Sequence, residues 1–249
     1  MRSSIFALAL SLASPAFAES SLGITGATLS FGALQDESGA EQVLSRATVD
    51  VAITEAHGLQ GDLSFEDTGH GTIGRLAAHL YMDPVHGQKY GLFFAMSDLD
   101  GRSLNWVSAG VEGQLDLSEN LQIAGRTGLG RVDEGGLDYI FGGVSVAYAV
   151  SPATTFEATL DVADFDETDF RATSIDIGLR AAYSPEGSPW GIEATAIHSD
   201  LTGRDGAAGE MRLGLGLTMA FGNAGGTSRD TRHFRDHDAV APLVRRGLQ

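Results

Sequence analysis

The sequence predicts an all-β chain that folds as a transmembrane, up-and-down antiparallel β-barrel of about 12 strands, with a polar lumen and an apolar outer face. First, large apolar side chains alternate with polar or small ones in segment after segment, which is the period of a strand. Second, these segments span roughly 9 to 14 residues, whereas strands of globular sheets usually have five or six. Third, turn residues separate the segments at regular intervals, which favours an up-and-down meander.

The segment 210–221 shows the alternation most clearly, because Met211, Leu213 and Leu215 alternate with Arg212, Gly214 and Gly216. The same pattern predicts 12 strands, and the alternation is clearest over 22–31, 43–54, 59–66, 75–82, 89–96, 107–116, 121–129, 140–150, 155–162, 174–183, 190–196 and 210–221. Connections on one side are expected at Gly58, 83–87, 118–120, 151–152 and 184–189, and on the other side at 33–42, 67–71, 98–103, 131–136, 163–169 and 199–209.

The chain divides into three parts. Residues 1–18 read as a signal peptide, with Arg2 as the positive start, an apolar stretch over 5–13 and a small-x-small cleavage site at 16–18. Residues 19–221 carry the strands. Residues 222–249 differ in composition, and we expect a polar, disordered tail on the periplasmic side.

Composition excludes several classes of protein. The chain has 33 acidic and 16 basic residues, a net charge of −17, which argues against nucleic acid as a partner. It has no cysteine, so disulfides, thiol catalysis and cysteine-bound metals are excluded. No cofactor is implied by any motif, and no segment after the signal peptide has the 18 apolar residues of a membrane-spanning helix.

Alternation alone does not say which face lies inside, because a soluble sandwich and a membrane barrel have the same period. Strand length, an even strand number and the signal peptide favour the membrane. So does the position of the charges, since a charged side chain facing lipid costs about 2–4 kcal/mol at the bilayer midplane. The residues expected to line the lumen are Arg46, Asp50, Asp62, Glu66, Arg75, His79, Lys89, Glu112, Asp116, Arg126, Glu157, Asp161, Asp176, Arg180, Glu193 and Arg212.

The last strand resembles the assembly signal of Gram-negative outer-membrane β-barrels of porin-like type, with Leu217, Met219 and Phe221 on one face and an aromatic residue at its end. The resemblance implies an outer-membrane location, recognition by the barrel-assembly machinery, and contact with outer-membrane lipid and lipopolysaccharide. It departs from the family pattern in one respect, because 28 residues follow Phe221. It names a class and no particular solute.

Metal sites have only weak candidates. Asp164, Asp166 and Asp169 offer oxygen ligands suited to calcium but lack the spacing and glycine of an EF-hand loop. His233 and His237 lie four residues apart, a spacing that could bind metal on a helix. Solvated acidic loops and a solvated tail are the simpler interpretations, so no metal is expected.

We expect a channel for passive diffusion of small solutes through a narrow charged lumen. The alternative is a plugged barrel with a structural or adhesive role, and a barrel enzyme acting on outer-membrane lipid is a third hypothesis. His79 lacks an evident nucleophile, and Asp50, Asp62 and Glu66 are interpreted as ion-pair partners of nearby arginines. Phe93 and Trp106 fall on the lumen side, where they either constrict the pore or mark a bulge. The longest expected loop is short, which favours a monomer, although the sequence does not define the oligomeric state.

Overall fold

The structure is a computed structural model, and it describes residues 23–168, 170–222 and 233–248. The predicted signal peptide, residues 1–18, lies outside the described residues. The elements are β1 (Ile24–Asp36), β2 (Glu41–Ala52), β3 (His57–Thr68), β4 (Gly71–Val85), β5 (Gln88–Leu99), β6 (Leu104–Asp116), β7 (Leu121–Val132), a 3-10 turn η1 (Glu134–Gly136), β8 (Asp138–Ser151), β9 (Thr154–Asp166), β10 (Arg171–Tyr183), β11 (Trp190–Thr202), β12 (Ala207–Gly222) and α1 (Ala241–Arg245).

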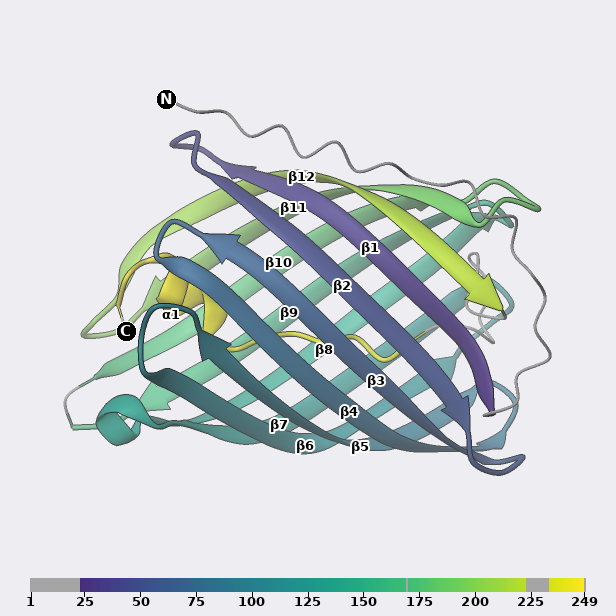
Figure 1. Ribbon diagram of the computed structural model, residues 1–249, viewed down its shortest axis with the longest axis horizontal. Coiled ribbons are helices and arrows are strands. Elements are labelled where there is room, and N and C mark those ends of the chain that lie inside the picture. Colours follow the sequence, from purple (N-terminus) through teal and green to yellow (C-terminus); the bar gives the residue numbers. More distant parts are fainter. Residues whose placement is uncertain (1–22, 169, 223–232, 249) are drawn as a thin grey trace.

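The 12 strands form one closed antiparallel barrel in which each strand pairs with its sequence neighbours and β1 pairs with β12 (Figure 1). This confirms the predicted fold class. At the closing seam, β1 and β12 pair without interruption from Gly26 opposite Gly222 to Asp36 opposite Arg212. Closure removes the unpaired sheet edges that an open sheet would expose.

The barrel has two rims. The N-terminal rim is the end at which β1 begins and β12 finishes, and the loop rim is the opposite end, which carries η1 (Figure 1). Strands are longer than predicted, from 12 to 16 residues, because the predicted loop-rim connections partly belong to strands. The connection predicted at 199–209, for example, is reduced to residues 203–206. Gly58, predicted as a turn, lies inside β3, and the turn falls at residues 53–56 instead.

The two faces of the wall differ in polarity. Outward-facing side chains are large and apolar on every strand, for example Leu92, Leu129 and Leu215, which are 60%, 66% and 74% exposed. Such a belt, continuous around the barrel, is suited to hydrocarbon and not to water. The interior carries the charged and hydroxyl side chains, so the structure has the parity of a membrane barrel and not that of a sandwich.

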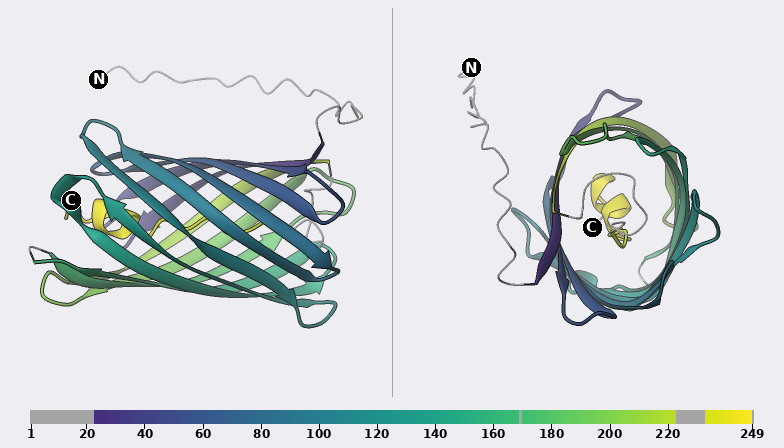
Figure 2. Two further views of the ribbon diagram at one scale, coloured as in Figure 1. Left: turned by 90° about the horizontal axis from the view of Figure 1, so that it is seen from below. Right: turned by 90° about the vertical axis from the view of Figure 1, so that its right-hand side faces the viewer.

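The interior is not empty. Residues 233–248, here called the lumen segment, lie inside the ring of strands (Figure 2). From the sequence, these residues are expected to belong to a solvated tail. For residues 233–248 that expectation is wrong, since Phe234, Val240 and Leu243 are at most 4% exposed. The five-residue α1 is the one α-helix among the described residues. It is too short to span a bilayer.

Candidate functional site: the lumen and the segment inside it

The lumen segment runs along the barrel axis toward the loop rim. Its first residue, His233, contacts Thr28 and Asp50, whereas Arg246 near its end donates to the backbone carbonyl of Ser199 on β11. Between these points residues 233–238 form neither helix nor strand and run as an elongated trace (Figure 1), and the chain becomes helical at α1. The segment therefore places the last turn of the described chain at the rim opposite the end of β12.

Side chains of the wall satisfy the backbone of the extended part. Five consecutive carbonyls, those of residues 233 to 237, each accept a hydrogen bond from a different wall side chain. The donors are Gln114, Gln60, Arg126, Arg46 and Arg75, in that order, at 2.8, 2.9, 2.7, 3.4 and 3.3 Å. These donors come from β6, β3, β7, β2 and β4, so the backbone of the segment is bound by the half of the wall from β2 to β7. Buried backbone groups need such partners, since leaving one unpaired costs free energy.

Gln60 makes two of these contacts at once. Its amide nitrogen donates to the carbonyl of Phe234, and its amide oxygen accepts from the N–H of Phe234 at 2.7 Å. The side chain is fully buried. It thus binds the segment as a neighbouring strand would, through both backbone groups of one residue.

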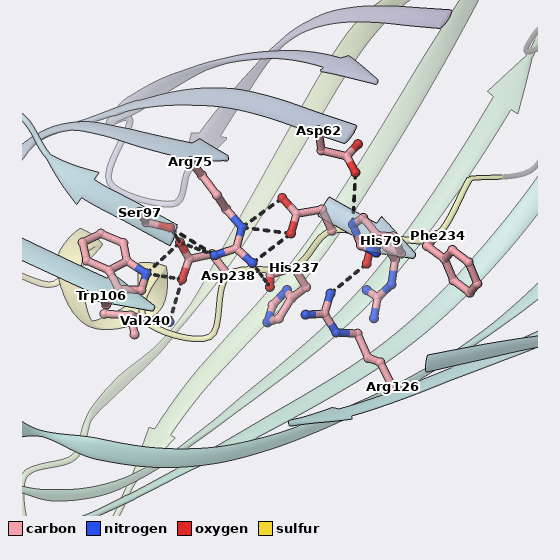
Figure 3. Close-up of polar contacts among 12 residues, drawn as sticks. Asp62, Arg75, His79, Ser97, Trp106, Arg126, Phe234, His237, Asp238 and Val240 are labelled. Carbon is pink, nitrogen blue, oxygen red and sulfur yellow. Dashed lines mark hydrogen bonds and ion pairs between the residues drawn. The ribbon is translucent and has the colours of Figure 1, made fainter. Parts of the chain in front are cut away.

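Two carboxylates of the segment are held by a cradle on neighbouring strands, formed by Arg75, Ser97 and Trp106 (Figure 3). Arg75 Nε and Nη2 lie 2.9 Å from Asp236, with both side chains at most 5% exposed. Asp238 accepts from Trp106 Nε1 at 2.9 Å and from Ser97 Oγ at 3.0 Å, and lies 3.4 Å from Arg75 Nη1. Charge-assisted bonds of this kind are about twice as strong as neutral ones.

Beyond the cradle, toward the loop rim, the lumen wall becomes apolar. Val240, Leu243 and Val244 of the segment are at most 1% exposed and pack against an apolar lining. That lining consists of Ile73, Phe93, Leu99, Leu104, Trp106, Val132, Leu137, Tyr139, Phe141, Ala163, Phe165, Ala172 and Leu201. We call it the apolar cup. Phe93 and Trp106 belong to it, and β5 and β6 pair in unbroken register there, so the alternative of a bulge at these residues is wrong.

All the charged residues predicted for the lumen project inward, and most of them bind one another or the segment. His233 binds Asp50 on β2, Arg235 binds Asp161 on β9 and Arg245 binds Glu66 on β3, at 2.6, 2.7 and 2.6 Å. Lys89 lies 5.3 Å from the centre of the Phe234 ring. Other predicted residues contact neighbouring wall residues. Gln122 donates to Asp116, and Arg212 donates to Gln42 and Ser199. Asp176 is buried opposite Ser199 on the neighbouring strand.

His79 occupies the middle of this network (Figure 3). Its Nδ1 lies 2.7 Å from Glu112 and its Nε2 lies 3.1 Å from Asp62, while the ring stacks on Phe234 with 4° between the planes. Both ring nitrogens are engaged by carboxylates, which leaves neither to activate a hydroxyl nucleophile. The geometry is that of a residue that orders the lumen.

Part of the lumen stays open beside the segment. A cavity of about 410 Å³ lies beside residues 233–236 and is lined mainly by β9 to β12 and β1, with further lining residues on β2, β3, β6, β7 and β8. Threonine and serine side chains line it together with Arg180, whose guanidinium binds Glu157 at 2.7 Å and Glu193 at 3.1 Å. The cavity reaches the turn at Ser184 and Ser188, so it forms a polar vestibule at the N-terminal rim.

The weak metal candidates are used otherwise. Asp164 accepts from Thr173 and Asp166 pairs with Arg171, while Asp169 lies outside the described residues. His233 and His237 are on extended chain and contact different carboxylates, Asp50 and Asp161. No cluster of three or more potential ligands that could hold a metal occurs within residues 23–168, 170–222 and 233–248.

A closed ring of 12 antiparallel strands with an apolar outer face and a charged interior is the fold of the porin-like outer-membrane β-barrels. No protein-family model matches the chain, and no curated protein matches it in sequence. Solved structures do resemble it. The NanC porin is 12% identical with a TM-score of 0.58, and the match covers 77% of this chain and 98% of that one.

Two further structures show the same likeness. The KdgM porin, solved in complex with disordered oligogalacturonate, is 12% identical with a TM-score of 0.56, over 78% of this chain and 99% of that one. The COG4313 outer membrane channel from Pseudomonas putida F1 is 11% identical with a TM-score of 0.56, over 80% of this chain and 96% of that one. At such identities the likeness concerns the fold alone. The ligand named for one of these structures is therefore not assigned to this chain.

Proposed function

We propose that the protein is an outer-membrane channel for small solutes whose lumen is closed by its own C-terminal segment. The observation that carries the proposal is the lumen segment itself, because it occupies the path along the barrel axis through noncovalent contacts. Its polar contacts could be exchanged for water if the segment left. The resemblance to NanC, KdgM and the COG4313 channel supports a transport role for a barrel of this size.

The closed state described here combines two halves. The half at the N-terminal rim keeps a polar vestibule of about 410 Å³, which small hydrated solutes could enter. The half at the loop rim is sealed by α1 in the apolar cup. A solute could cross only after the segment moves, so conduction would be gated. The acidic loops and the lipid-facing belt would contact lipopolysaccharide and lipid in the same membrane.

Single-channel recording in planar bilayers tests this proposal. The full-length chain should be closed most of the time, whereas a chain ended after Gly222 should show stepwise conductance. Because the shortened chain could fail to fold, a second form keeps the full chain and carries a protease site within residues 223–232, to be cut after folding. Heat-modifiable migration on a gel would identify folded barrels. A folded barrel without conductance after removal of the segment would favour the plugged structural role.

A further inference from the structure

We propose that the lumen is a binding site for extended peptides that carry an acidic-x-acidic pair, and that the lumen segment occupies it as an internal ligand. This inference rests on the proposed gating, because a peptide can enter only when the segment is out. It specifies the class of solute. The site has three parts, each formed by a different group of wall residues, and each part selects one feature of the ligand.

The first part is recognition of the peptide backbone. Five successive carbonyls are bound by five wall side chains, and Gln60 also accepts from one N–H. Such contacts do not depend on which side chains the bound chain carries. They require an extended peptide, because successive carbonyls must reach side chains of different strands. A small ion lacks this series of acceptors.

The second part is the charge of the ligand. Arg75, Ser97 and Trp106 converge on two carboxylates that lie two residues apart, those of Asp236 and Asp238. Arg75 and Trp106 are 6% and 1% exposed. When the segment is out, water can bind these donors, so a ligand that displaces this water must supply acceptors in its place, because leaving the donors unpaired is costly. An acidic-x-acidic pair supplies the acceptors.

The third part is the end of the ligand near the loop rim. The apolar cup accepts Val240, Leu243 and Val244, which have helical spacing on one face. A peptide that fits the whole site is therefore extended, then acidic, then apolar toward its C-terminus. The site joins backbone recognition, which is general, to two side-chain requirements that select among peptides.

A competition experiment on the full chain tests the inference. The chain has no cysteine, so Gln249→Cys gives a single labelling position next to the exposed Leu248. The labelled protein is folded in detergent, then cut at a protease site placed within residues 223–232. Fluorescence anisotropy then reports whether the labelled peptide stays in the barrel. No conduction is needed, so this experiment can succeed or fail independently of the bilayer recording.

Three unlabelled competitors are compared. The first is the peptide 233–249. The second keeps the side chains that pair with charged wall residues or enter the apolar cup and replaces all others by alanine, so it retains His233, Arg235, Asp236, Asp238, Val240, Leu243, Val244 and Arg245. The third is the second peptide with both aspartates changed to asparagine. We expect the first two to displace the labelled peptide within about tenfold of each other, and the third to be weaker by about tenfold or more, because each lost charge-assisted bond is worth about one such factor.

A wall variant provides the matched control. Gln60→Ala should make the labelled peptide leave at lower competitor concentration, whereas Arg180→Gln should not, because Arg180 binds Glu157 and Glu193 across the vestibule. Any of three results would overturn the inference. These are no exchange with excess native peptide, displacement by the native peptide but not by the alanine-based one, and equal displacement by the aspartate and asparagine peptides.

Discussion

Replacing Arg75 by glutamine should open the channel. Arg75 contacts both carboxylates of the segment and the carbonyl of His237, and the Arg75 and Asp236 side chains are 5% and 3% exposed. Breaking a buried pair by removing one partner costs about 3–5 kcal/mol. The whole cost falls on the closed state, because Asp236 regains water when the segment leaves. At about 1.4 kcal/mol per factor of ten, the ratio of open to closed channels should rise by about 10²- to 4 × 10³-fold.

The lower end of this range is expected, because Arg46 and Arg126 also lie near Asp236 and reduce the loss. Single-channel recording of the full-length variant measures the open probability directly. The double variant Arg75→Gln with Asp236→Asn should be more closed than Arg75→Gln alone, since no unpaired charge is then buried. Arg180→Gln serves as the control for a lost arginine elsewhere in the lumen. An unchanged open probability in Arg75→Gln, with the barrel folded, would refute the reasoning.

Three other outcomes follow from the structure. Leu243→Ala removes a fully buried side chain from the apolar cup and should weaken closure by about 2–5 kcal/mol, seen as a higher open probability in single-channel recording, whereas Leu248→Ala at the exposed end should change little. Leu215→Arg on the lipid face should destabilise the barrel in vesicles by up to about 2–4 kcal/mol in urea titrations, and an equal stability of Leu215→Arg and Leu215→Phe would contradict a hydrocarbon environment. An impermeant maleimide should label Gln249→Cys from the same side of the membrane as Asp100→Cys at the loop rim, and from the side opposite to Glu186→Cys at the N-terminal rim. Labelling of Gln249→Cys from the same side as Glu186→Cys would show that the segment does not run through the lumen to the loop rim.

The wall of the barrel could be predicted from the sequence because its cause is local. Alternation places side chains on two faces, and the penalty for charge in hydrocarbon keeps Arg46, Arg126 and Arg212 on the inner one. Strand ends could not be placed well, since residues such as Asp36 and Asp98 have turn-forming types yet pair within β1 and β5. Pairing with a neighbouring strand outweighed their local preference.

The position of the lumen segment could not be predicted in the same way, because its contacts join residues more than 100 positions apart, such as Arg75 with Asp236. Two features of the sequence do point to it. Aromatic residues of the inner parity, including Phe93, Tyr139 and Phe165, gather at one end of neighbouring strands, where a water-filled lumen would not need them. Val240, Leu243 and Val244 supply a matching apolar face in an otherwise polar tail.

The course of the lumen segment also constrains how the barrel is built. β12 ends at one rim, but residues 245–248 lie at the other, so the last part of the chain must travel the length of the lumen. A helix with its side chains is about 10–12 Å wide, and a finished ring offers little room for it to thread past Arg75 and Arg126. Laying the segment down before β1 meets β12 would avoid that passage. β12 would then pair with β1 only after the chain that follows β12 lies inside the incomplete sheet.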